Sequence, residues 1–368
     1  MRLDPAVTRR RANHPGEGPH PWLTSAVLPL RTDAFVLRAL VPCDAPDIAA
    51  YRSDPEVARY QSWATPFPVD KVDAAIARFI AEGGPQEDSF FTIGIADPVT
   101  DELFGDVALK LEWAGRSAEI GYTLARPHHG RGLASGAVFA LLDHLFSTTD
   151  LRRAHATLHP DNHPSARLLE RLGFEYEGTD REGFWVVDEC SDDVRYGVLR
   201  DEWRAWHAPG PGRPARVDLV EIDAANRDEV RRLRVHRSQE RLVSSVTKSL
   251  ADALIPDLVD GVPVTPWYRA VEADGTLVGF VMLAEQTEHL PDPYLWRLLI
   301  DRAHQRRGIG RMVVEALVGR LRTEGAGRLM VSWNPGPGTP EPFYRRLGFV
   351  PTGELDGEEI VAALDLVR

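Results

Sequence analysis

Two glycine-containing loops in this sequence combine residues that could bind phosphate. The second loop, at 305–310, reads Gln-Arg-Arg-Gly-Ile-Gly and lies between an apolar strand-like run at 294–300 and a helix-like run at 312–321. Backbone N–H groups at a helix N-terminus attract anions, and glycine lets a ligand approach the backbone closely. Arg306 and Arg307 add positive charge. This order of strand, loop and helix predicts a site for a pyrophosphate group.

Other phosphate-binding loops do not fit this pattern. A P-loop needs Lys and then Ser or Thr after the second glycine, and a dinucleotide-binding loop needs a third glycine where this sequence has Val313. Two interpretations remain. The Gln-x-x-Gly-x-Gly loop binds a pyrophosphate, or it is an ordinary helix start whose glycines only turn the chain.

The same arrangement occurs earlier in the chain. The first loop, at 129–134, reads His-Gly-Arg-Gly-Leu-Ala, follows a strand-like run at 118–124 and precedes a helix-like run at 137–146. Each loop is followed, at nearly the same distance, by the sequence Arg-Leu-Gly-Phe, at 171–174 and 346–349. Two matches in the same order indicate an internal repeat of domain size.

The elements that position the loops can be assigned from apolar periodicity and turn residues. Strands are expected at 90–96 and 103–112 in the first half, and a hairpin is expected at 267–284 in the second. Helices are expected to start at Val69 and end at Gly83, and to span 228–237.

The glycine loop resembles the coenzyme A signature of the GNAT family of N-acetyltransferases. The first half resembles the RimJ/RimL-type ribosomal-protein acetyltransferases, and the second half resembles the bacterial spermine/spermidine N-acetyltransferases. The matching residues of the first half include Asp54-Pro55-Glu56-Val57, Tyr60, Trp63, Glu119-Ile120-Gly121-Tyr122 and Asn162-His163-Pro164-Ser165-Ala166; those of the second include Gln239, 279–282 and 343–349.

The resemblance implies a mixed α/β (α+β) fold with two tandem domains, each a mostly antiparallel sheet flanked by helices. We expect a mobile arm at 1–24, a first domain at 25–206, a Pro/Gly-rich linker at 207–216 and a second domain at 217–368. A chain of 368 residues is long for one core and suits two.

Composition limits the classes of partner. The net charge of −12 argues against nucleic acid and is compatible with cationic amines. We find no membrane-length apolar run, and we expect no signal peptide. Cys43 and Cys190 lack metal-site spacing and are expected to be buried thiols. These features suggest a cytoplasmic protein that binds no metal, nucleic acid or membrane, as a monomer or homodimer.

Acyl transfer to an amine needs a base, oxyanion stabilisation and a proton for the leaving thiolate. A carboxylate on an otherwise apolar strand is costly unless it is solvated or functional, and the resemblance implies that Glu119, on the strand before the first loop, is the base. An outward-facing carboxylate there would also be ordinary. The matching strand of the second half has no carboxylate, so the base there is left open and could be His304, Glu285 or a water chain. The resemblance implies that Tyr344 is the acid, unless it only packs, and that Ser165 assists the thiolate.

Acetyl-CoA is the expected cofactor. The resemblance implies that the strands before the loops are splayed from their neighbours, and that the backbone there binds the pantetheine arm and the oxyanion. The residues expected to bind the coenzyme are Leu124, Ala125, His129, Gly130, Arg131, Gly132, Leu133, Ala134 and Asn162 in the first half, and Leu299, Ile300, Gln305, Arg306, Arg307, Gly308, Ile309, Gly310 and Asn334 in the second.

The expected function is therefore acetyl transfer to a primary amine, by direct attack in a ternary complex. The acceptor is a small cationic metabolite or an amine-bearing antibiotic. If it is an antibiotic, we expect the protein to act in antibiotic resistance. Two alternatives remain: acetylation of a protein N-terminus, and acyl-CoA binding or sensing in which one or both domains no longer catalyse transfer.

Overall fold

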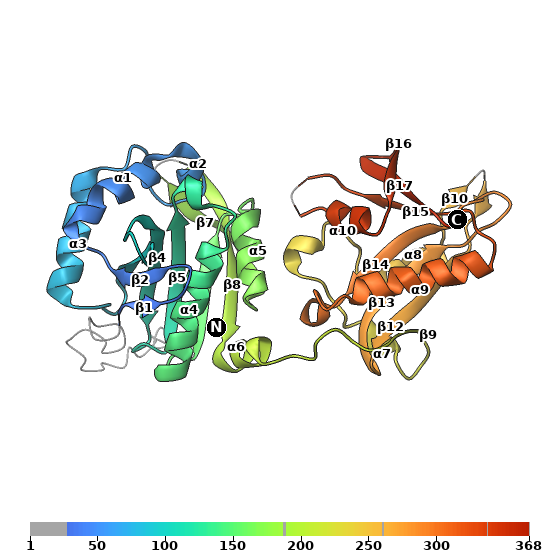
Figure 1. Cartoon of the computed structure of the whole chain (residues 1–368), viewed down its shortest axis with the longest axis horizontal. Coiled ribbons are helices and arrows are strands. Elements are labelled where there is room, and N and C mark those ends of the chain that lie inside the picture. Colours follow the sequence, from blue (N-terminus) through green and yellow to red (C-terminus); the bar gives the residue numbers. More distant parts are fainter. Residues whose placement is uncertain (1–27, 187–188, 260, 337, 368) are drawn as a thin grey trace, which may run out of the picture. The chain divides into compact units, whose positions relative to one another are not determined.

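The computed structural model describes residues 28–186, 189–259, 261–336 and 338–367 (Figure 1). The arm predicted at 1–24 lies outside these residues. Contacts divide the chain into two compact units between His207 and Ala208. Each unit is described by itself.

The first domain is built on an eight-stranded sheet in the order β1-β2-β3-β4-β5-β6-β8-β7. Within the described part of this domain, β5 and β6 run parallel and the other neighbouring strands run antiparallel. The strands are β1 (Leu30–Arg31), β2 (Val36–Ala39), β3 (Phe90–Ala96), β4 (Leu103–Glu112), β5 (Ser117–Leu124), β6 (Arg153–Leu158), β7 (Glu175–Val186) and β8 (Glu189–Leu199). The helices are α1 (Ala45–Ser53), α2 (Pro55–Ala58), α3 (Val69–Glu82), α4 (Leu133–Thr148), α5 (His163–Arg171) and α6 (Arg200–His207), with 3-10 turns η2 (Pro42–Asp44) and η3 (Arg126–His128).

Strand alternation gives β4 and β5 two different faces. Leu109 and Ile120 pair across the strands and belong to the buried core that also contains residues of α4 and α5. The opposite face carries Lys110 and Glu119, which also form a cross-strand pair. Figure 1 shows α1 and α3 on one side of the sheet and α4 and α5 on the other. The first domain therefore has a polar sheet face at the middle of β5.

The second domain has a seven-stranded sheet in the order β16-β17-β15-β14-β13-β12-β9, and a separate β10-β11 pair. Among the strands that the structure describes here, β14 and β15 run parallel and the other neighbours run antiparallel. The strands are β9 (Val217–Val220), β10 (Leu258–Val259), β11 (Val262–Pro263), β12 (Pro266–Ala273), β13 (Thr276–Ala284), β14 (Tyr294–Ile300), β15 (Arg328–Trp333), β16 (Val350–Asp356) and β17 (Glu359–Asp365). The helices are α7 (Arg227–Val230), α8 (Val246–Leu254), α9 (Ile309–Thr323) and α10 (Glu341–Arg346), with 3-10 turns η4 (Arg237–Gln239) and η5 (Arg302–His304).

Two buried clusters cover the two faces of this second sheet. One contains Val313 and Leu317 of α9 together with Tyr344 of α10. The other contains Val246 of α8 with Phe280 of β13. The predicted fold class, two mostly antiparallel sheets flanked by helices, is confirmed.

Two local predictions are wrong. The helix expected at 228–237 ends at Val230 in the structure, and a turn follows it. Beyond the turn, the backbone N–H of Arg234 donates to Asp301 Oδ2 and its carbonyl accepts from the N–H of Arg302, so these groups are not available for helical hydrogen bonds. Cys43 and Cys190 are free and exposed rather than buried, since they lie in a surface 3-10 turn and near the start of β8. No helix in the described residues is long and apolar enough to cross a membrane.

Candidate functional site

Among the described strands, each domain has one parallel pair, and this pair is short and then separates. The β5–β6 ladder joins residues 117–119 to 153–155, and β5 continues to Leu124 paired only with β4. The β14–β15 ladder likewise joins residues 294–295 to 330–331, while β14 continues to Ile300. The outer backbone groups of these two strands are therefore available to an extended ligand arm. The structure shows the splayed strands that the resemblance implies.

The first loop prepares the N-terminus of α4 to bind an anion. Gly132 is the N-cap residue, with a left-handed φ of 78°, and no side chain caps the helix. The first-turn N–H groups consequently have no intrahelical acceptor. Gly130 also has a positive φ of 73°, and no other described atom lies within 4 Å of where a Cβ would be at either glycine. The loop is open on the side where a phosphate would approach.

The first residue of each loop bonds back to the preceding strand in the same way. His129 Nε2 lies 2.9 Å from Leu124 O, and Gln305 Nε2 lies 3.1 Å from Ile300 O. The imidazole of His129 therefore makes the contact that an amide makes in the second loop. Gln305 Nε2 also bonds to Gln239 Oε1 at 2.9 Å.

The second loop repeats the geometry of the first. Gly308 is the uncapped N-cap residue of α9, with a φ of 81°. A pyrophosphate and an extended pantetheine arm fit both sites, because each has unpaired helix N–H groups beside arginines and an open strand edge. The residues that would hold coenzyme A are those of the two loops and the ends of β5 and β14.

Glu119 lies where β5 and β6 stop pairing, within a charged cluster. Its carboxylate forms an ion pair with Lys110 and lies 3.5 Å from Thr157 Oγ1. Lys110 Nζ is also 3.1 Å from Glu112, whose carboxylate is 3.0 Å from His155 Nε2. Partial burial lowers the pKa of Lys110, but the bonds to Glu119 and Glu112 raise it overall. The Lys110 ammonium therefore remains charged beside the Glu119 carboxylate.

Ser165 and Asn162 lie on the other face of β5. Asn162 caps α5 by accepting the N–H of Ser165 at 3.3 Å, and Tyr122 Oη donates to Ser165 O at 3.3 Å. Burial raises the pKa of Tyr122. Tyr122 was not predicted as a site residue, although a tyrosine three positions after Glu119 must point to the opposite face of the strand.

Tyr344 lies on the α9 side of β14. Its ring stacks on Trp333 at 5.7 Å and packs edge-on against Phe349 at 5.4 Å. Burial raises its pKa, so the phenol keeps its proton at neutral pH. Asn334, predicted to bind coenzyme, donates from Nδ2 to Glu359 Oε1 at 2.9 Å.

The opposite face of β14 lines an acidic cavity of about 440 Å³. The cavity lies beside the point where β14 and β15 separate, between α8 and the β16–β17 hairpin. It is lined by Lys248, Asp252, Ile255, Asp257, Met282, Tyr294, Trp296, Arg297, Ser332, Asp356 and Glu359. Sequence analysis missed this cavity, because its carboxylates come from distant segments and none lies on β14.

The residues considered as bases for the second domain lie elsewhere. His304 follows β14 in η5, bonds to Arg307 and has its pKa lowered by burial. Glu285 forms an ion pair with Arg320 of α9. Neither residue lines the acidic cavity.

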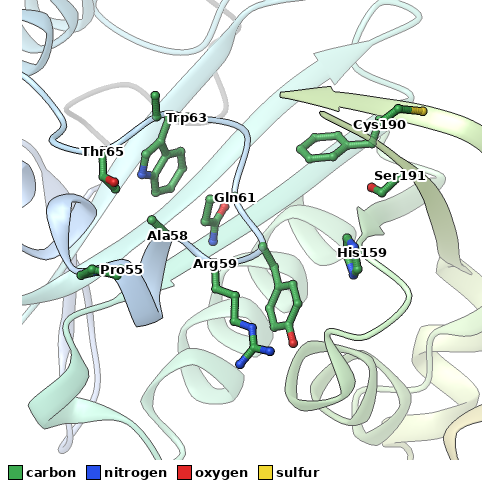
Figure 2. A pocket seen from close by; sticks show the side chains of 12 residues that line it. Pro55, Ala58, Arg59, Gln61, Trp63, Thr65, His159, Cys190 and Ser191 are labelled. Carbon is green, nitrogen blue, oxygen red and sulfur yellow. The ribbon is translucent and has the colours of Figure 1, made fainter. Parts of the chain in front are cut away.

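The first domain has a cavity of a different kind, of about 390 Å³. Figure 2 shows Trp63 and Thr65 on one side of it and His159, Cys190 and Ser191 on the other. Its lining also includes Tyr60, whose ring lies 5.1 Å from that of His159, and the lining contains no carboxylate among the described residues.

Comparison with known proteins gives the family. The sequence model described as "Acetyltransferase (GNAT) domain" matches residues 35–175, and the model described as "Acetyltransferase (GNAT) family" matches residues 230–349. The "Uncharacterized N-acetyltransferase p20" of Bacillus licheniformis is 33% identical over 180 residues, which cover 47% of this chain and 97% of that protein.

Two further proteins carry more specific names. The "[Ribosomal protein uS5]-alanine N-acetyltransferase" of Escherichia coli is 26% identical over 183 residues, covering 47% of this chain and 92% of that protein. The crystal structure of spermidine N-acetyltransferase from Vibrio cholerae, in complex with CoA and spermine, matches with a TM-score of 0.41 and 22% identity, covering 47% of this chain and 99% of that one. The chain belongs to the GNAT family of acetyltransferases, carries two of its domains in tandem, and is an acetyl-CoA-dependent N-acyltransferase.

Proposed function

We propose that the protein acetylates a primary amine of a small cationic molecule, a metabolite or an amine-bearing antibiotic, and that the acidic cavity of the second domain receives it. The observation that carries this proposal is the position of the cavity. Four carboxylates surround it beside the end of the β14–β15 ladder.

The charges of the cavity favour a cation. Lys248 and Arg297 both pair with Asp252, at 3.1 and 3.6 Å. Asp257, Asp356 and Glu359 have no salt-bridge partner within the part of the chain that the structure describes. Carboxylates on a partly closed surface attract an ammonium group and raise its local concentration.

The residues divide the chemistry between the two faces of β14. Acetyl-CoA supplies the activated acetyl group. Glu359 holds the acceptor ammonium, because its bonds to Ser332 and Asn334 fix the position of its carboxylate. The acceptor amine must lose a proton before attack, and a carboxylate of the cavity accepts it directly or through water. Tyr344, on the other face, retains a proton for the departing thiolate.

The test is a panel of acceptors with acetyl-CoA and the full chain. The panel contains diamines, polyamines, aminoglycoside-type antibiotics, neutral amines and N-terminal peptides. Free-thiol release gives the rate, and product mass identifies the acceptor. Cationic small amines should give product, whereas exclusive turnover of peptides, or none of any acceptor, would contradict the proposal. Coenzyme binding without turnover would instead indicate a sensing protein.

The first domain supports a second candidate function. Its cavity combines the rings of Tyr60, Trp63 and Phe184 with the Arg59 guanidinium, and no carboxylate of the described chain lines it. This lining suits a peptide better than a polycation. Together with the RimJ/RimL resemblance, it supports acetylation of a protein N-terminus in the first domain. N-terminal peptides should then be acetylated in a reaction that is lost in Glu119→Gln.

A further inference from the structure

The segment that joins the two domains contacts the coenzyme loop of the second domain. Arg307 Nε donates to Gly212 O at 3.0 Å. A Cβ placed on Gly308 would lie 3.7 Å from Arg213 Nε and 3.8 Å from Arg213 Cδ. No described atom takes this place beside Gly132 in the first domain. The second loop therefore has an additional guanidinium that the repeat itself does not supply.

The position of Arg213 is fixed from both sides. Gly212 is held by Arg307, and the N–H groups of Ala215 and Arg216 bond to the carboxylate of Asp274 at 3.2 and 2.9 Å. The N–H of Asp274 returns a bond to Arg216 O at 3.1 Å. Prolines at 211 and 214 further restrict the backbone. A short, anchored segment can present its side chain at little entropic cost.

The charges around this loop are not balanced by carboxylates. Arg307 bonds to the neutral acceptors Gly212 O and His304 Nδ1. Among the described residues neither Arg213 nor Arg306 has a salt-bridge partner, whereas Arg311, one turn further on, pairs with Glu315 at 2.8 Å. Like charges gathered at the positive end of a helix repel one another unless an anion binds between them.

We propose that Arg213 is a phosphate ligand of the second coenzyme site, so that the inter-domain linker is part of that site. The guanidinium would contact a phosphate of coenzyme A beside the N-terminus of α9. Coenzyme binding would in turn hold the linker in place. This inference concerns the coenzyme and does not depend on the identity of the acceptor.

The experiment uses the full chain carrying Gly132→Glu, so that only the second site binds. Calorimetry compares coenzyme A with pantetheine, which lacks all the phosphates. Arg213→Gln should weaken coenzyme A binding by about three- to tenfold, as expected for one exposed charge-assisted contact, and leave pantetheine binding unchanged. Arg213→Lys should recover part of the loss.

The control is Arg328→Gln, which removes the same charge at the start of β15, where Arg328 pairs with Asp292 at 2.6 Å. Its affinities should not change. Hydrogen exchange adds a second readout: coenzyme A should slow exchange at the amides of Gly212 and Arg213, and this protection should be lost in Arg213→Gln. Unchanged or tighter coenzyme A binding in Arg213→Gln would overturn the proposal, as would an equal loss of pantetheine binding.

Discussion

Lys110 and Glu119 face each other across β4 and β5, and their side chains form an ion pair at the point where β5 separates from β6. The pair places the predicted base of the first domain beside the open strand edge. It also occupies that base, because the Lys110 ammonium competes with an acceptor amine for the carboxylate.

Glu119→Gln keeps the shape of the side chain and removes its basicity. If Glu119 is the base, turnover in the first domain should fall on the order of 10²–10⁴-fold, while coenzyme binding should barely change. Lys110→Met is the matched variant. Loss of the ammonium removes the ion pair but keeps the carboxylate, so Lys110→Met should retain far more activity than Glu119→Gln. Single-turnover rates of the two variants, measured against pH, test these expectations. An unchanged rate in Glu119→Gln would show that Glu119 is an ordinary surface carboxylate and not the base.

Gly132→Glu and Gly308→Glu should each remove one coenzyme site. Both positions have a left-handed φ, of 78° and 81°, which strains any side chain, and the added carboxylate repels phosphate. Calorimetry should find two sites in the wild type and one in each variant. Gly319→Glu adds the same charge within α9, where the structure leaves open space, and should keep both sites. A single site in the wild type would refute the two-site description.

His129→Gln should preserve coenzyme binding in the first domain. The amide can replace the bond from His129 Nε2 to Leu124 O, as Gln305 does with Ile300 O. His129→Leu cannot make this bond and should weaken binding by about three- to tenfold through loss of one hydrogen bond. Calorimetry in the Gly308→Glu chain isolates this site. Equal affinities for the Gln and Leu variants would show that the bond is unimportant.

Tyr344→Phe removes only a hydroxyl group from α10. If Tyr344 supplies the proton to the thiolate, turnover in the second domain should fall on the order of 10²-fold or more. Because burial raises the pKa of Tyr344, the phenol should keep its proton at a pH where an exposed tyrosine loses it. Wild-type activity should therefore not fall as the pH rises through that range. Thermal unfolding serves as the control, since the ring packing on Trp333 is retained. A variant with wild-type single-turnover rates would assign Tyr344 to packing alone.

Local patterns in the sequence were sufficient to predict the two loops and the strands before them. Glycine is favoured where φ is positive, as at Gly132 and Gly308, and apolar runs separated by a turn predicted β3 and β4 at the bounds that the structure gives. These features depend on residues that are close in the chain.

Features built from distant segments could not be predicted in this way. The Lys110–Glu119 pair depends on the register of two strands. The acidic cavity joins α8 to the β16–β17 hairpin, so Asp252 and Glu359 become neighbours only in the folded domain. The helix expected at 228–237 is shortened because a tertiary contact of Arg234 with Asp301 replaces helical hydrogen bonds.

The most direct test of the central claim is the KM of a small diamine for the wild type, Asp356→Asn and Glu354→Gln. Asp356 lines the acidic cavity, whereas Glu354 lies outside it on the same strand. Glu354→Gln therefore removes the same charge without changing the cavity. The account predicts that Asp356→Asn raises the KM for the diamine by about three- to tenfold, as expected for one exposed ion pair, and leaves the KM for acetyl-CoA unchanged, while Glu354→Gln behaves as wild type. Equal diamine KM values for all three chains would contradict the assignment of this cavity to a cationic amine.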